Sequence, residues 1–150
     1  MVLFALTPSV FAGMIVSWGD DSHGTGILNV PTGNDFIDIG GSAHAAFAVK
    51  GDGSLVAWGD DSQGTGILNI PTGNNFIAVG GSDYAAFAVR TDGSLVSWGD
   101  DSHGTGILNV PTGNDFIDVA GGTDYALALT PEPATLFLLG LGTAMLRKKR

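Results

Sequence analysis

The chain has 150 residues, a formal net charge of −9 and no cysteine. The missing cysteine excludes disulfides, thiolate metal sites and a cysteine nucleophile. Four of the six basic residues are the last four of the chain, so the preceding part is strongly acidic and repels phosphate backbones. This argues against nucleic acid as a partner.

Residues 1–12 form a short apolar run that ends in Val10, Phe11 and Ala12. Its length fits the hydrophobic region of a secretory signal peptide, but the basic residues that normally precede that region are missing. We therefore predict a truncated signal peptide. The alternative is an edge strand or apolar flap, whose regularity Pro8 would limit.

From residue 13 to residue 130 the sequence repeats itself. Trp18, Trp58 and Trp98 each open the run WGDDS, which gives a period of 40 residues. Such a period, with several short apolar runs in each unit, is typical of propeller blades or a β-solenoid. The 24 glycines and six prolines recur at fixed places, which indicates turns rather than disorder. We expect an all-β domain of about three β-propeller-type blades.

Each unit contains four runs that we expect to form short strands. AAFAV and SLVAW, or their equivalents, flank an Asp-Gly pair at residues 52–53 and 92–93, which is the strongest short hairpin signal. ILNVP is predicted as an outer strand ended by proline, and FIDI as a buried strand before a Gly-Gly turn. In AAFAV alanine lines one face, so that the next sheet can approach closely.

The two ends of the repeat region complement each other. The third copy stops at residues 125–130 without its Asp-Gly hairpin, and residues 13–19 match the strand that is missing there. Three blades are fewer than the four to eight usual for propellers. The alternatives are a ring shared by two or more copies, which makes a homo-oligomer, an open arc, or a fragment of a longer propeller. We also expect one extra residue near Ala120, as a bulge or longer turn.

The order of a Gly-Gly turn, an alanine-rich strand, Asp-Gly, a Val-x-Trp-Gly strand and a glycine-rich loop resembles the regulator of chromosome condensation repeat, in its compact bacterial form. The resemblance covers residues 13–130 and implies blades of that family, whose rings are seven-bladed. Secreted relatives include an inhibitor of β-lactamase, so the resemblance also implies protein binding through a propeller face. The family's nucleotide-exchange and chromatin roles do not carry over, because this acidic chain has no residues for them.

The sequence departs from the family pattern at two places. Gly-Thr-Gly stands at residues 24–26 and in both other copies, where Gly-Gln-Leu is usual. The family histidine after the Gly-Gly turn survives only as His44, with Tyr84 and Tyr125 in the other copies. A role specific to that histidine therefore has no support from the repeats.

Residues 131–150 form a tail of three parts: Pro131-Glu132-Pro133, an apolar run at 134–146, and the basic end Arg147, Lys148, Lys149 and Arg150. The apolar run makes a helix of roughly 20 Å, short for a hydrocarbon core of about 30 Å, and the basic end favours the cytoplasm. The tail resembles the PEP-CTERM sorting signal of Gram-negative bacteria. This implies export to the cell envelope or outside the cell, an exosortase as processing partner, and transient inner-membrane anchoring by a C-terminal helix. A simple tail anchor and a terminal core helix are the alternatives.

Paired aspartates recur in the loop after each tryptophan: Asp20, Asp21, Asp60, Asp61, Asp100 and Asp101. Carboxylates beside hydroxyls and backbone carbonyls can hold Ca²⁺, but the EF-hand spacing is missing. We expect these side chains to cap turns, with weak Ca²⁺ binding as the alternative. No cofactor is predicted.

Catalytic chemistry has little support in the sequence. Ser22-His23 and Ser102-His103 are sequence neighbours, which does not give nucleophile-base geometry, and Gln63 replaces the histidine in the middle copy. The Gly-Thr-Gly runs lack the lysine of a phosphate loop. The three tryptophans are expected in the core rather than as platforms for sugars.

Our leading hypothesis is a non-enzymatic, exported repeat protein of the cell envelope or extracellular matrix, with a binding or structural surface for a protein or polysaccharide. The alternatives are a specific protein-binding or inhibitor propeller, an enzyme acting on envelope polysaccharide, and a truncated fragment of a longer propeller. Nearly identical loops in all copies argue against a specific site, because such a site usually needs differing residues.

Overall fold

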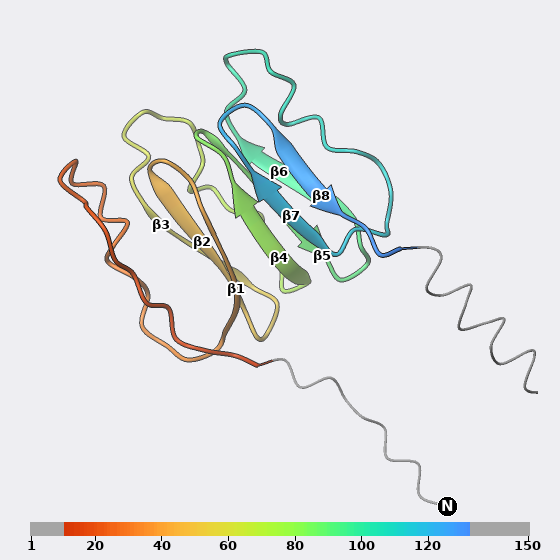
Figure 1. Cartoon of the computed structure of the whole chain (residues 1–150), viewed down its shortest axis with the longest axis horizontal. Helices are drawn as coiled ribbons and strands as arrows, with labels where there is room; N and C mark the ends of the chain where they lie inside the picture. The colour runs from red at the N-terminus through yellow and green to blue at the C-terminus, as the bar shows by residue number, and fades with distance from the viewer. Residues whose placement is uncertain (1–10, 133–150) are drawn as a thin grey trace, which may run out of the picture.

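The computed structural model describes residues 11–132. They form three antiparallel sheets that lie side by side in a row (Figure 1). Sheet A contains β1 (Phe36–Gly41), β2 (Ala45–Lys50) and β3 (Leu55–Gly59); sheet B contains β4 (Phe76–Gly81), β5 (Ala85–Arg90) and β6 (Leu95–Gly99); sheet C contains β7 (Asp118–Gly121) and β8 (Ala126–Leu129). The all-β prediction is confirmed for these residues, and the expected C-terminal helix lies outside them.

The predicted hairpins are formed. β2 pairs with β3, and β5 pairs with β6. Gly53 and Gly93, in the turns, have φ angles of 81° and 78°, a conformation that glycine adopts without a steric penalty. Asp52 Oδ1 accepts hydrogen bonds from the backbone N–H and the hydroxyl of Ser54, at 2.9 and 2.6 Å, which fixes the turn.

The predicted outer strand of each unit is not formed, and this expectation was wrong. In the middle copy the segment is a tight turn, in which the Asn69 N–H donates to the Gly66 carbonyl at 3.0 Å. Gly66 has a φ of 73°, and Pro71 has no N–H to extend a ladder. Ile67 is still buried, so each complete unit supplies three strands and one packed turn.

The first strands of the sheets, β1, β4 and β7, lie next to one another. A Cβ atom at Gly80 would lie 2.6 Å from the carbonyl oxygen of Val119, and one at Gly40 would lie 2.6 Å from that of Val79. Neighbouring sheets therefore touch backbone to backbone at these positions. Only glycine allows this approach, which explains the Gly-Gly step of the repeat.

Away from this contact, the side chains of one sheet pack into the next. Phe47 of β2 shares a buried cluster with Ala86 and Ala88 of β5, so the alanine face has the predicted role. The Phe47 ring meets the Trp98 indole edge-on, with 5.6 Å between ring centroids and 90° between planes. The hydrophobic core thus lies between sheets A and B and continues, in a second cluster, toward sheet C.

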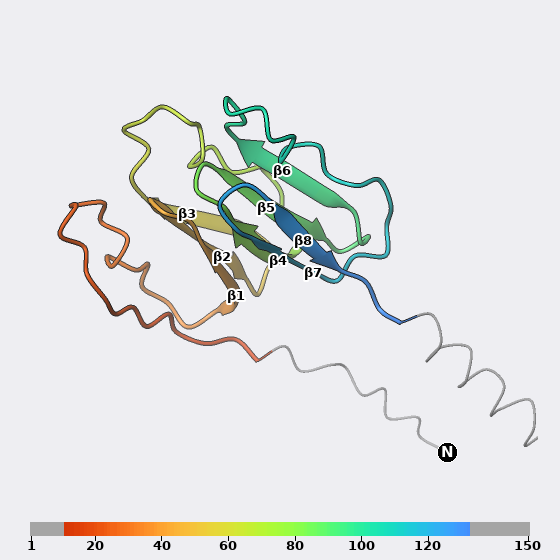
Figure 2. The ribbon, with the colours of Figure 1, turned by 45° about the horizontal axis from the view of Figure 1, so that its top comes forward.

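Residues 13–19 do not complete the third sheet of the same chain. Gly13 makes one bridge to Phe36 of sheet A, and the rest of the segment forms no strand. The segment lies at the end of the row opposite to β8 (Figure 1), and Figure 2 shows it beside sheet A from a second side. The described chain is therefore an open row with two unfinished ends.

The extra residue expected near Ala120 is also absent. Ala120 pairs with Leu127, and the equivalent pair in sheet A is Gly40 and Phe47. Ala120 and Leu127 each stand two whole periods after Gly40 and Phe47. The third copy therefore has substitutions rather than an insertion. Tyr125 is one of these substitutions, because it stands where the other copies have alanine.

Candidate functional site

One end of the sheets carries two kinds of loop from every copy. The turns between the first and second strands lie here, and so do the loops that follow the tryptophans. The Asp60 N–H donates to the His44 carbonyl at 2.8 Å, and the Asp100 N–H donates to the Tyr84 carbonyl at 2.9 Å. We call this end the loop face.

The paired aspartates hold the loops of this face together. Asp60 Oδ1 accepts from the Ser62 N–H at 2.9 Å, and its Oδ2 accepts from the Ser62 hydroxyl at 2.6 Å. Asp61 accepts from the N–H and hydroxyl of Thr65, at 2.9 and 2.8 Å, and from the Gly66 N–H. The same pattern recurs at Asp20 and Asp21 and at Asp100 and Asp101. These carboxylates cap turns.

These hydrogen bonds also affect the acidity of the aspartates. The Ser62 hydroxyl and N–H lower the pKa of Asp60, and the Thr105 hydroxyl lowers the pKa of Asp101. Each bond favours the charged carboxylate. Within residues 11–132, no three Asp, Glu or His side chains are placed to share a metal ion. Weak Ca²⁺ binding by these loops stays an untested prediction.

Neither serine of the Ser-His neighbours donates its hydroxyl proton to the adjacent histidine. Ser22 donates its hydroxyl proton to Asp20, at 2.8 Å. Ser102 donates in the same way to Asp100. The His103 ring lies instead against Tyr84. Both serines thus take part in capped turns, and His103 has an aromatic neighbour.

Three aromatic rings form a row across the loop face. His44 and Tyr84 lie with ring centroids 6.4 Å apart and planes inclined by 25°; Tyr84 and His103 lie 5.6 Å apart at 22°. Tyr84 also borders two small hollows, whose walls include Asp60, Asp61, Asp83, Asp100, Asp101 and Asp124. The row therefore combines stacking faces with carboxylate acceptors. We call it the aromatic row.

Sequence reasoning missed the aromatic row. Its members are 40 and 19 residues apart, and they meet because neighbouring sheets place equivalent turns side by side. The signal was present in the repeat itself, since His44 and Tyr84 occupy the same position of successive copies.

The three tryptophans have different environments. Trp98 is buried and donates its Nε1–H to the Ile67 carbonyl at 2.8 Å. Trp58 is half-buried and makes the same bond to Ile27. Trp18 is 84% exposed, so the core position predicted for it is wrong. The difference follows from the neighbours, because residues 11–17 contain no sheet against which Trp18 could pack.

The sorting residues lie at the end of the described chain. Pro131 and Glu132 follow β8 after Thr130 and are exposed. Pro133, Arg147, Lys148, Lys149 and Arg150 lie outside the described residues. Within 11–132, no helix is long and apolar enough to cross a membrane.

Comparison with known families gives one match. The family model described as the PEP-CTERM protein-sorting motif matches residues 129–150. It confirms the sorting signal and indicates an exported protein that an exosortase processes, with a C-terminal membrane anchor before processing. A comparison with curated proteins finds no match.

Several solved structures resemble the fold, among them the following two. For the entire ectodomain of the Physcomitrella patens receptor kinase CR4, the TM-score is 0.52 at 16% identity, covering 69% of this chain and 30% of that one. For Prp20p from Saccharomyces cerevisiae, the TM-score is 0.52 at 14% identity, covering 77% of this chain and 36% of that one. The chain thus spans about a third of the length of these neighbours, and at such identities the likeness concerns the fold alone. The chain is an exported, exosortase-sorted protein with a β-propeller-like fold.

Proposed function

We propose that this chain is a non-enzymatic repeat protein of the cell envelope or extracellular matrix, whose loop face binds envelope polysaccharide. The sorting motif supports the location, because it begins at the last residue of β8 and leaves the sheets on the exported side. The blades are proposed to be of the regulator of chromosome condensation type. The order of the Gly-Gly step, Asp-Gly hairpin and tryptophan strand supports this blade type.

The hydrogen bonds of the polar groups on the loop face support a non-enzymatic role. Asp60 accepts hydrogen bonds from the N–H and hydroxyl of Ser62, and Asp61 accepts from the N–H of Thr65. A nucleophile or general base needs a free lone pair aimed at substrate. In the Asp60 loop the Ser62 hydroxyl donates to a carboxylate, and Gln63 follows it where the other copies have histidine, which supports turn capping rather than nucleophilic catalysis.

The aromatic row carries the proposed binding function. A sugar ring presents an apolar C–H face and a rim of hydroxyl donors. Tyr84 lies between the two histidine rings, so the solvent side of the row is the surface that a sugar ring contacts, as at many aromatic binding surfaces. Asp60, Asp83 and Asp100 supply acceptors for the hydroxyls at its edge. Repeated sugar units match a row of rings that runs from one sheet to the next.

Binding of a specific protein is the second candidate function, and one observation favours it. The loops are nearly identical, but the position that supplies His44 and Tyr84 to the aromatic row varies, since Asp124 stands there in the third copy. A specific protein site needs such differences. Basic side chains of a partner would fit the carboxylates of the loop face.

The polysaccharide proposal is tested by co-sedimentation of the full chain with extracellular polysaccharide purified from the producing bacterium. We expect Tyr84→Ala to weaken binding about tenfold, which corresponds to about 1.4 kcal/mol. The control is Ile117→Ala, because Ile117 is a 46% exposed apolar residue outside the row. Equal binding by both variants and the unmodified chain would refute the role of the row.

A further inference from the structure

Sheet C has an open edge. It contains two strands, whereas sheets A and B contain three, and within residues 11–132 β8 pairs only with β7. Phe47 of β2 and Phe87 of β5 are fully buried, but Leu127, at the equivalent position of β8, is 64% exposed. The side chain of Leu127 therefore has the place of a core residue without the neighbour that would cover it.

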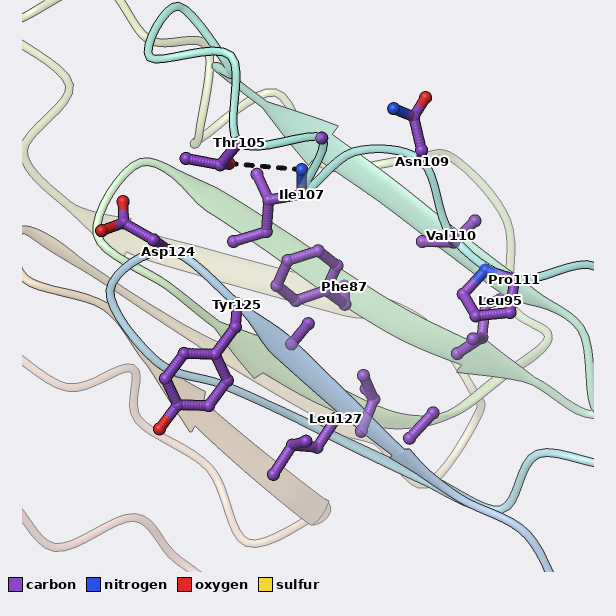
Figure 3. Close-up of a pocket in the computed structure, with 14 residues that line it drawn as sticks. Phe87, Leu95, Thr105, Ile107, Asn109, Val110, Pro111, Asp124, Tyr125 and Leu127 are labelled. Carbon is purple, nitrogen blue, oxygen red and sulfur yellow. Dashed lines mark hydrogen bonds between the residues drawn. The ribbon is translucent and has the colours of Figure 1, made fainter.

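A cavity of about 320 Å³ lies beside this edge, between β8 and the loop 105–111 (Figure 3). Phe87, Ile107, Val110 and Leu127 supply much of its apolar lining. In the preceding unit the corresponding space is filled by Trp98, which packs on Phe47 and bonds to Ile67. Phe87 and Ile107 stand one period after those two residues. The cavity is thus an indole site without its tryptophan.

The opposite end of the row holds a segment of the matching kind. Residues 13–19 read GMIVSWG, against GSLVAWG and GSLVSWG in the strands β3 and β6 with their preceding glycines. Gly19 has a φ of 121°, close to the 117° of Gly59 and the 106° of Gly99. Trp18 is 84% exposed and Val16 is 73% exposed. The segment has the sequence of a third strand, and within residues 11–132 it pairs with no hairpin beyond its single bridge.

We propose that residues 13–19 of a second copy of this chain add to β8 as the third strand of sheet C. The register follows from the pairs of sheets A and B: Trp18 of the second copy lies opposite Ala126, Ser17 opposite Leu127 and Val16 opposite Ala128. Its indole fills the cavity and donates its Nε1–H to the Ile107 carbonyl, as Trp98 does to Ile67.

The loop face gives the joint a complementary polar pair, a histidine N–H donor and a carboxylate acceptor. In sheet B, His103 stacks on Tyr84, which stands one period before Asp124. The histidine that follows the added strand is His23. At the joint, His23 of the second copy therefore lies beside the carboxylate of Asp124. In sheet B the same two positions hold His103 and Tyr84.

A second copy is required because the two ends of one chain lie at opposite ends of the row (Figure 1). Each copy supplies two complete sheets and one shared sheet, so two copies joined at both ends give six blades. This number lies within the four to eight of known propellers. Both joints are then equivalent under a twofold axis, which closes the assembly at two copies.

The inner strands meet less closely at the joint than within the chain. Gly40 and Gly80 allow backbone contact with the following sheet, but Ala120 occupies this position in β7. The Cβ atom of Ala120 faces the next copy and increases the distance between the two backbones. Replacing Ala120 with glycine removes that atom, and we expect it to strengthen association.

The first test is sedimentation velocity of the full 150-residue chain, over a range of concentrations, in mild detergent because of its apolar tail. We expect a species of two copies. Trp18→Ala and Leu127→Asp should each weaken association about 30-fold or more, as removal of a central tryptophan typically does. Ile77→Ala is the control, because Ile77 is an exposed apolar residue of β4 away from both ends.

An equimolar mixture of the two variants separates this joint from any other contact. Trp18→Ala retains an intact sheet C, and Leu127→Asp retains an intact segment 13–19, so one good joint forms between them and the two-copy mass returns. Self-association of Trp18→Ala equal to that of the unmodified chain would overturn the proposal. So would a mixture that stays monomeric while circular dichroism shows both variants folded.

The register is tested by crosslinking, since the chain has no cysteine of its own. Ser17→Cys combined with Leu127→Cys places the two thiols in a cross-strand pair, and we expect a covalent two-copy species on mild oxidation. Ser17→Cys combined with Leu95→Cys is the matched control and should crosslink much less. The opposite result would refute the register.

Discussion

Replacing Gly80 with alanine tests whether backbone contact between sheets sets their spacing. The new Cβ atom would lie 2.6 Å from the Val119 carbonyl oxygen and 3.1 Å from the Cα atom of Ala120, so sheets B and C must move apart. Overpacking of this kind costs about 1–3 kcal/mol. The lower chain entropy of unfolded alanine offsets about 0.4–1 kcal/mol of that cost. We expect a net destabilisation of about 1–2 kcal/mol.

The assay is urea unfolding of the full chain, followed by the fluorescence of its tryptophans. With a slope of about 2 kcal/mol per molar urea, the midpoint should fall by about 0.5–1 M. Gly13→Ala is the control, because nothing lies within 4 Å of its added Cβ atom and its backbone φ is not in the left-handed region. If the two variants had equal midpoints, the proposed steric reason for the Gly-Gly step would be wrong.

Three further predictions concern the core, the loops and the tail. Phe47→Ala should lower the free energy of unfolding by about 3–5 kcal/mol in urea titrations, whereas Leu127→Ala, at the equivalent exposed position, should lower it by less than about 1 kcal/mol. The pKa of Asp101 is lowered in the folded state, mainly by the Thr105 hydroxyl, so its stabilising effect is present above pH 3.8 and is lost as the pH falls through its folded pKa. Thr105→Val should reduce that loss, measured as the difference in urea midpoint between pH 6 and pH 3, and an unchanged difference would contradict this role. Substitution of Glu132 by alanine should leave the tail uncleaved, which mass spectrometry of the envelope fraction detects, whereas normal cleavage would show that this residue is not read.

The hairpins were predictable because their signals are local. Asp52 and Gly53 determine a turn through φ and a side-chain hydrogen bond, whatever lies around them. The alanine face of β5 was predictable for a similar reason, since alternation within one strand decides which side chains can meet the next sheet. Both features depend on a few consecutive residues.

The features that sequence reasoning missed depend on neighbours. The run ILNIP has the composition of a strand, but Gly66 and Asn69 close a turn before any ladder can form. Trp18 has the same local sequence as Trp98, yet it is exposed because the described part of the chain has no sheet before it. Prediction of the aromatic row would have required the knowledge that equivalent turns of adjacent sheets lie within stacking distance.

The hydrogen bond from Trp98 to Ile67 has a consequence for how the chain acquires its fold during export. The donor stands 31 residues after the acceptor, so each packed turn is completed by a strand that comes almost one repeat later. A chain that crosses a membrane from its N-terminus therefore exposes Phe47 until the second hairpin arrives with its indole. Folding then advances one repeat behind translocation, and sheet C, which follows the last such bond, is the part that unfolds most readily in the isolated chain.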